Sequence, residues 1–165
     1  DLADLIQSFR SSRDTCILPD MADPLTKTLY STYLSYLDPQ GFSYFADMKT
    51  DDRGWLFELI KSPNIGQIFV SQTKPGITRG GHYHHTKVEK FVVVQGQAVI
   101  RFRQIDSDEI IEYPVSGEKI EIVDIPPGYT HDITNVGDTD VITLFWACEI
   151  FNPNDMDTVF LKVDP

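Results

Sequence analysis

The sequence predicts an all-β domain, a sandwich or barrel of short strands, preceded by a short helical segment. Two observations predict this fold. In the first forty residues the apolar side chains recur at helical intervals. Beyond Gly41 the chain breaks into short β-like runs separated by turn residues, a spacing typical of sandwiches and barrels. We therefore expect residues 1–40 to form a helical linker or tail and residues 41–165 to form the β domain.

The N-terminal segment carries signals for two helices. The first is indicated by apolar residues at helical spacing, namely Leu2, Leu5, Ile6 and Phe9. The second is expected to begin at Asp23-Pro24, because Asp caps a helix and Pro fits its first turn. It is expected to end at the turn sequence of residues 38–41.

Strands are predicted where β-prone residues lie between turn signals. The runs are residues 65–73, 90–95, 98–104, 109–113, 119–125 and 141–147. Val92 and Val94 lie on the strand face opposite Phe91 and Val93. A strand that is apolar on both faces must be covered on both, either by the N-terminal helices or by a second subunit.

Composition narrows the function classes. A net charge of −11 makes the chain a poor non-specific binder of nucleic acid or anionic membrane. No apolar run approaches the length of a membrane span, and no secretory signal pattern is present at the N-terminus. Cys16 and Cys148 form no metal-binding or disulfide pattern, so we expect reduced thiols in a cytoplasmic protein.

Basic residues are concentrated in one part of this acidic chain. Residues 74–103 hold one acid, Glu89, and six bases: Lys74, Arg79, Lys87, Lys90, Arg101 and Arg103. Such a basic segment is expected to meet an anionic small-molecule substrate. The alternative is a solvated strand face whose lysines protect a sheet edge.

The four histidines point to a metal site. On a strand, His82 and His84 face the same side, whereas His85 faces the other side. Glu89 follows five residues after His84, and His131 follows a Pro-Pro-Gly turn. Three imidazoles and a carboxylate on rigid strands suit a mononuclear site for a divalent metal, so we predict His82, His84, Glu89 and His131 as ligands.

Two stretches carry a family resemblance. They are Gly76-x5-His82-x-His84-x4-Glu89-x6-Gly96 and Pro126-x-Gly128-x2-His131-x3-Asn135. Both resemble the motifs of the cupin superfamily, over residues 65–147. The resemblance implies a double-stranded β-helix, the jelly-roll barrel, and a metal held by those histidines and the glutamate. Zn²⁺ is the expected ion, with Fe²⁺, Mn²⁺ or Ni²⁺ possible. One family glycine is replaced by Ile120, and we expect Gly117 to serve that turn instead.

A longer likeness is more particular. The string TKPGITRGGHYHHTKVEKF of residues 73–91 resembles the C-terminal cupin domain of the CapF family of capsular polysaccharide biosynthesis proteins. The helical string LYSTYLSYL of residues 29–37 resembles the segment that joins the reductase domain of that family to its cupin. In that family the resemblance implies a zinc cupin that epimerises C3 of a UDP-2-acetamido-2,6-dideoxy-4-hexulose. An NADPH-dependent reductase domain then acts on the C4 ketone, on the route to UDP-N-acetyl-L-fucosamine.

The resemblance also sets expectations about partners. No Gly-rich dinucleotide motif is present, so we expect this chain to be the isolated epimerase half without a nucleotide cofactor, NADPH belonging to an N-terminal reductase domain of the full-length protein. A homodimer through the barrel is also expected. The rival functions are an iron cupin dioxygenase, which uses the same ligand types, and a sugar-binding cupin without turnover.

A more distant likeness bears on the chemistry. The sequence Arg79-Gly80-Gly81-His82-Tyr83 resembles a motif of dTDP-4-dehydrorhamnose 3,5-epimerases, in which the matching histidine is the general base. His82 cannot easily be both a metal ligand and a free base. Candidate proton carriers are therefore His82, Tyr83, His85, Tyr129 and Glu149. Candidate substrate contacts are Lys74, Arg79, Lys87, Arg101, Arg103 and Trp146.

Overall fold

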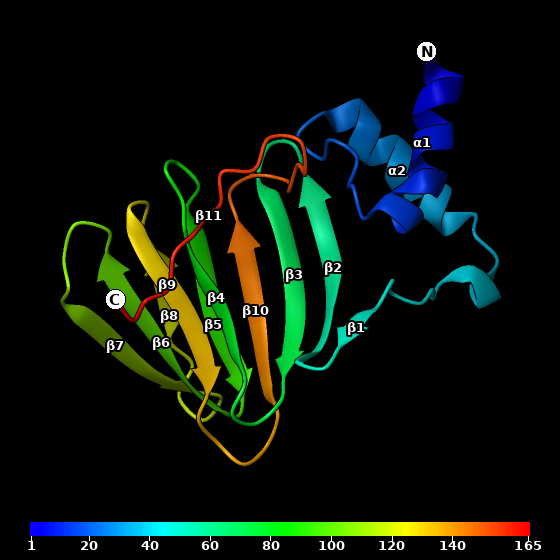
Figure 1. Cartoon of the computed structure of the whole chain (residues 1–165). Helices are drawn as coiled ribbons and strands as arrows, with labels where there is room; N and C mark the ends of the chain where they lie inside the picture. Colours follow the sequence, from blue (N-terminus) through cyan, green and yellow to red (C-terminus); the bar gives the residue numbers. More distant parts are fainter.

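The computed structural model describes the whole chain, residues 1–165. Two helices and a short 3-10 helix precede eleven strands (Figure 1). The helical elements are α1 (Leu2–Thr15), α2 (Pro24–Ser35) and η1 (Pro39–Gly41). The strands are β1 (Lys49–Asp51), β2 (Gly54–Ser62), β3 (Gly66–Thr73), β4 (Thr78–Tyr83), β5 (Glu89–Gln95), β6 (Gln97–Gln104), β7 (Ile110–Ser116), β8 (Ile122–Ile125), β9 (Tyr129–Asn135), β10 (Val141–Ala147) and β11 (Val159–Phe160).

The strands form two antiparallel sheets that pack face to face, which confirms the predicted all-β jelly roll. One sheet has the order β1-β2-β3-β10-β5-β8 and the other β11-β4-β9-β6-β7. Alternate side chains of each strand fill the space between the sheets. The buried core comprises Phe91, Val93, Ala98, Ile100, Phe102, Val115, Val123, Ile125, Ile133, Val141 and Phe145.

The helical segment packs mainly on itself. As expected, α2 begins after Asp23, whose carboxylate accepts a 2.8 Å hydrogen bond from the Thr26 N–H. Phe9 of α1 is fully buried, and its ring lies 5.2 Å from that of Tyr30 on α2. Neither helix has the length and apolar character needed to cross a membrane.

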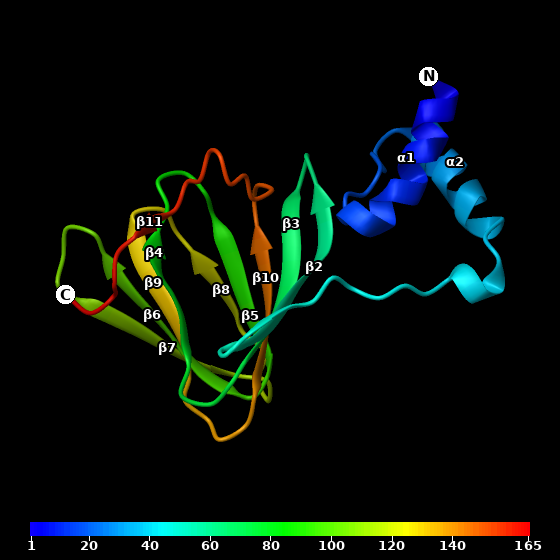
Figure 2. The same cartoon turned by 45° about the vertical axis from the view of Figure 1, so that its right-hand side comes forward.

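The helices do not provide the outer cover expected for β5. They stand beside β2, which is separated from β5 by β3 and β10 in the sheet (Figures 1 and 2). Val94 of β5 is accordingly 45% exposed in the single chain. The outer face of β5 is therefore left open by the helices in the single chain.

Gly117 occupies a turn where no side chain fits. Its N–H donates to the Gly96 carbonyl at 3.0 Å, which joins the end of β7 to the β5–β6 turn. A Cβ at this position would lie 2.6 Å from the Val94 carbonyl oxygen. This close approach requires glycine at position 117, in a turn three residues before Ile120.

The C-terminal residues 157–164, here called the C-terminal strap, cross the outer face of the five-stranded sheet (Figure 1). Within the strap, β11 pairs with β4. The Leu161 N–H then donates to the Gly81 carbonyl at 3.0 Å, and its carbonyl accepts from the Thr130 hydroxyl. The strap therefore lies against β4 and β9, two strands that also carry histidines.

Candidate metal centre

The four predicted ligands converge between the sheets. His82 lies on β4, His84 follows that strand, Glu89 begins β5 and His131 lies on β9. His82 and His131 are register partners, which brings the two strands' imidazoles together directly. One ligand atom from each of the four residues lies within 4.8 Å of those of the others.

A glycine bulge lets β4 approach β9 at this point. The register between the strands shifts between Gly80 and His82. Gly80 has a φ of 102°, and a Cβ there would lie 2.7 Å from the His131 carbonyl oxygen. Only glycine combines that conformation with that approach. The bulge therefore helps to set the direction of the His82 side chain.

The burial of the cluster fits a metal ion. The side chains of His84 and His131 are each 1% exposed, and their Nε2 atoms have no hydrogen-bond partner. These nitrogens lie 3.4 and 3.5 Å from Oε2 of Glu89. Buried nitrogens without partners are costly unless something else binds them. A divalent cation would satisfy both nitrogens and the carboxylate.

The protonation states also suit metal binding. Burial, reinforced by the neighbouring His131 and His84, lowers the pKa of His82 to about 4, so its ring is neutral near pH 7. Burial raises the pKa of Glu89, but contacts with His131 and His84 lower it by a larger amount. The net effect is a lowered pKa, so the carboxyl is ionised. Neutral imidazoles and an ionised carboxylate are the forms that bind metals.

The surroundings orient two of the rings. The Nδ1 atom of His84 is hydrogen-bonded to the Asp157 carbonyl oxygen, and that of His131 lies 3.3 Å from the Tyr129 carbonyl. Phe91 packs edge-on against His131 with ring centroids 5.7 Å apart. Occupying Nδ1 leaves Nε2 to face the cluster, which is a common arrangement for histidine ligands.

A hollow of about 140 Å³ lies beside the cluster. Its polar lining is Ser71, Arg79, His82 and Glu89. Arg79 is held in place by hydrogen bonds to the Thr73 hydroxyl and the Gln72 carbonyl, both 3.0 Å long. The Ser71 hydroxyl is buried without a partner, a feature that sequence reasoning did not identify. A buried, unpartnered hydroxyl in a pocket wall is suited to binding a polar ligand.

Of the other predicted substrate contacts, the structure brings Lys87 to the site and directs the two β6 arginines elsewhere. The ammonium of Lys87 lies 3.7 Å from Oε1 of Glu89. Arg101 is paired with Asp132 and Asp164 on the outer sheet face. Arg103 is buried and donates to the carbonyls of Val163, Lys162 and Ser107. The C-terminal strap thus occupies two of the three arginines that we expected to bind substrate.

Trp146 and Lys74 also lie outside the hollow. Adjacent residues of β10 face opposite sides, and Phe145 is the one in the pocket wall. The Trp146 indole instead donates to the Ile65 carbonyl at 2.7 Å. Lys74 is exposed in the β3–β4 turn.

The candidate proton carriers are dispersed. Tyr83 packs against the exposed His85, with ring centroids 5.3 Å apart, and neither lines the hollow. Tyr129 packs against the hydrophobic core, and Glu149 is also absent from the hollow's wall. Among these candidates, only His82 reaches the hollow.

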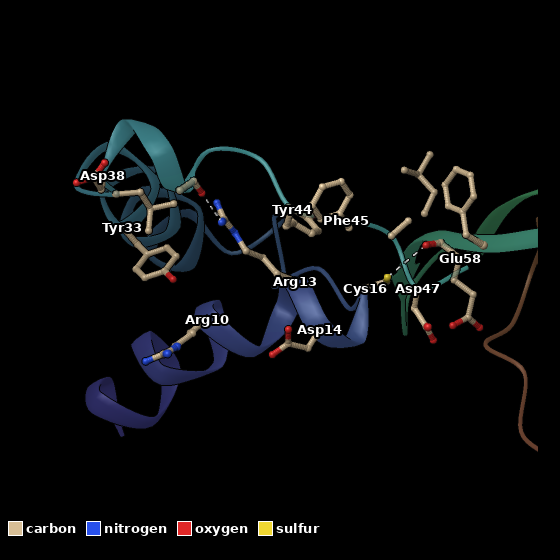
Figure 3. Close-up of a pocket in the computed structure, with 15 residues that line it drawn as sticks. Arg10, Arg13, Asp14, Cys16, Tyr33, Asp38, Tyr44, Phe45, Asp47 and Glu58 are labelled. Carbon is tan, nitrogen blue, oxygen red and sulfur yellow. Dashed lines mark hydrogen bonds between the residues drawn. The ribbon is translucent and has the colours of Figure 1, made fainter. Parts of the chain in front are cut away.

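A larger hollow of about 820 Å³ lies between the helical segment and β2. Figure 3 shows Arg13 directed at Gly41 and the Cys16 thiol directed at the Glu58 carbonyl. None of its lining residues belongs to the four-residue cluster or to the hollow beside it. The larger of the two hollows is therefore separate from the candidate metal site.

Two facing antiparallel sheets, with three histidines and a glutamate between them, define a cupin with a candidate metal site. Residues 49–159 match the model of the polysaccharide biosynthesis C-terminal domain. The chain belongs to this family.

Individual relatives agree with this assignment. The chain is 45% identical over 163 residues to a UDP-2-acetamido-2,6-beta-L-arabino-hexul-4-ose reductase of Pseudomonas aeruginosa, covering 99% of the chain and 44% of the relative. It is 24% identical over 118 residues to the spore coat polysaccharide biosynthesis protein SpsL of Bacillus subtilis, covering 66% of the chain and 78% of that protein.

A solved structure is also similar in shape. The capsular polysaccharide assembling protein CapF of Staphylococcus aureus superposes with a TM-score of 0.94 and 56% identity, over 98% of this chain and 44% of CapF. This agreement confirms the resemblance to the CapF family seen in the sequence. The chain spans less than half the length of CapF and of the Pseudomonas relative.

Proposed function

We propose that this domain is a metal-dependent epimerase that acts at C3 of a UDP-2-acetamido-2,6-dideoxy-4-hexulose in capsular polysaccharide biosynthesis. The carrying observation is the convergence of three imidazoles and one carboxylate beside a hollow that also holds Arg79. The Pseudomonas relative is named as a reductase of a 4-keto UDP-sugar, which indicates the chemical class of the substrate.

The reaction starts with removal of the C3 proton next to the 4-ketone, and charge then develops on the ketone oxygen. A bound divalent cation would supply Lewis-acid stabilisation of that charge, held by His82, His84, Glu89 and His131. Arg79, fixed at the wall of the hollow by two hydrogen bonds, adds a positive charge for the same oxygen or for a phosphate.

If all three histidines bind the metal, the carbon-bound proton must be taken by another group. His82 is the most exposed of the three and lines the hollow. A site in which His82 leaves the metal set and acts as base would match the distant 3,5-epimerase likeness.

The dimensions of the hollow limit how substrate is bound. Pockets that enclose drug-sized ligands measure roughly 300–1,000 Å³. The hollow beside the cluster measures about 140 Å³. We therefore propose that the sugar ring enters the hollow while the nucleotide lies along the open surface beyond it.

Solvent deuterium incorporation tests this function. The 4-keto UDP-sugar is incubated with the domain in D₂O, with and without a chelator, and deuterium at C3 is followed by NMR. We expect incorporation that is lost on chelation and restored by Zn²⁺. Incorporation unaffected by complete metal removal would contradict metal dependence, and no incorporation with metal bound would favour a sugar-binding role.

The native ion separates the epimerase from the rival oxygenase. We propose Zn²⁺, and metal analysis of protein purified without added metal tests this. Bound iron together with oxygen consumption in the presence of the sugar would instead support a dioxygenase.

The proposed assembly is a homodimer through the outer face of the six-stranded sheet. Val94 and Ile122, on the neighbouring strands β5 and β8, are 45% and 64% exposed there. Sedimentation of the wild type and of Val94→Asp tests this: we expect a dimer and a monomer respectively, and a monomeric wild type would contradict it. We further propose that a reductase domain lies N-terminal to this domain in the full-length protein.

A further inference from the structure

The loop between the candidate ligands His84 and Glu89, which crosses from β4 in one sheet to β5 in the other, is held by a residue from the C-terminal strap. Three successive backbone N–H groups, those of His85, Thr86 and Lys87, point at one carboxylate, that of Asp157. The donor–acceptor distances are 2.8, 2.7 and 2.9 Å. The Thr86 hydroxyl adds a fourth hydrogen bond at 2.9 Å.

The same residue also contacts a ligand directly. The backbone carbonyl of Asp157 accepts from Nδ1 of His84, whose Nε2 faces the cluster. Asp157 therefore fixes both the loop that carries two ligands and the ring orientation of one of them. It lies some seventy residues away along the chain, at the start of the C-terminal strap.

The remaining strap contacts hold Asp157 in position. Immediately after it, β11 pairs with β4, so that Phe160 is the register partner of His82. Further along, Arg103 binds the carbonyls of Lys162 and Val163 at 2.9 and 2.7 Å. The start of the strap is thus fixed by strand pairing and its end by a buried arginine.

We propose that Asp157 is a positioning residue for the metal centre, holding the His84–Glu89 loop and the His84 ring in the geometry that binds the cation. This inference rests on the proposed metal site. A carboxylate that accepts three N–H groups stays ionised, and the pKa of Asp157 is lowered accordingly: its burial opposes this, but the hydrogen bonds outweigh it. Residues that orient a metal ligand are worth about 10- to 100-fold in metal affinity.

The strap provides a matched control in Asp164. Its carboxylate accepts two hydrogen bonds from Arg101, at 2.9 and 3.1 Å, and it contacts no metal ligand. Asp157→Ala and Asp164→Ala each remove a strap carboxylate. Only the first releases the ligand-bearing loop. A role confined to fastening the strap would affect both variants alike.

The test uses Co²⁺ and Zn²⁺ binding to the metal-stripped protein. Affinity is measured by competition with a chromophoric chelator, the visible spectrum of the Co²⁺ form reports ligand geometry, and thermal unfolding of the metal-free proteins reports the fold. We expect Asp157→Ala to weaken Zn²⁺ binding by about 10- to 100-fold and to alter the Co²⁺ spectrum. Asp164→Ala should stay within about threefold and keep the wild-type spectrum, because its ion pair is exposed.

Wild-type affinity and spectrum in Asp157→Ala would overturn this inference, as would equal losses in both variants. If Asp157→Ala does not fold, the isosteric Asp157→Asn replaces it and should show the same weakened binding. A wild type that binds neither ion would overturn the metal site itself, and this inference with it.

Discussion

Removing the hydroxyl of Ser71 should stabilise the fold and weaken substrate binding. The Ser71 side chain is buried, and its oxygen has no hydrogen-bond partner although it lines the hollow beside the metal cluster. An unsatisfied buried hydroxyl costs about 1–3 kcal/mol. In Ser71→Ala that penalty disappears. The small void left by the hydroxyl is destabilising and offsets part of this stabilisation.

We therefore expect the free energy of unfolding of metal-free Ser71→Ala to exceed that of the wild type by about 1 kcal/mol, which corresponds to a rise of roughly 2–4 °C in Tm for a chain of this size. If the hydroxyl binds the sugar, its loss removes about 0.5–1.5 kcal/mol of binding, which is about a 2- to 12-fold rise in KM. Ser71→Ala should thus raise the Tm while it weakens substrate binding. A general packing defect would instead lower the Tm.

Thermal unfolding and C3 deuterium exchange kinetics measure the two effects. Thr143→Val is the matched control, because the Thr143 hydroxyl is also buried and unpartnered on the adjoining strand but does not line the hollow. It should raise the Tm without changing KM. The reasoning is refuted if Ser71→Ala lowers the Tm, or if its KM equals that of the wild type.

Three further predictions concern the site. Glu89→Gln removes the only anionic ligand and should weaken Zn²⁺ binding by more than about 100-fold, measured by chelator competition; unchanged affinity would exclude Glu89 as a ligand. Arg79→Ala should raise KM for the UDP-sugar by about tenfold through loss of a charge-assisted contact, with Arg53→Ala as a control outside the hollow; equal effects would contradict this role. The pKa of His82 is about 4 in the folded protein and 6.5 for a free histidine, so the unfolded chain takes up this proton first as the pH is lowered. The free energy of unfolding of the metal-free protein should therefore decrease as the pH is lowered from about 6.5 to about 4. Urea titrations should show a shallower fall in His82→Asn; an identical pH profile would refute the shift.

The ligand set could be predicted because it depends on local spacing. His82 and His84 share a strand face by parity alone, and the turn before His131 indicates where the next ligand-bearing strand begins. Helix starts are similarly local, and the Asp23-Pro24 cap appeared where the sequence placed it. These features need only a few neighbouring residues.

The roles of the arginines could not be read from the sequence because they depend on distant partners. Arg103 meets Val163 across sixty residues, and Arg101 meets Asp164 across sixty-three. Nothing in the local pattern indicates that a C-terminal strap crosses the strand that bears them. A basic strand segment therefore resembles a substrate surface until the strap is in place.

The sequence does not indicate which β10 side chains point into the barrel, because both faces of this strand are apolar. Phe145 and Trp146 are equally plausible inward residues, and only the pairing of β10 with β3 and β5 decides between them. Phe145 stacks on Phe69 inside the barrel, with ring centroids 4.7 Å apart. The role of Asp157 cannot be predicted from the sequence for a related reason, since a single aspartate near the end of the chain belongs to no motif.

Anomalous diffraction at the zinc edge, from crystals grown with Zn²⁺, would show whether the four side chains bind one metal ion. We predict one strong peak at about 2.0–2.2 Å from a nitrogen of His82, His84 and His131 and from an oxygen of Glu89. A fully loaded crystal with no peak among these four side chains, or with zinc bound elsewhere, would contradict the claim.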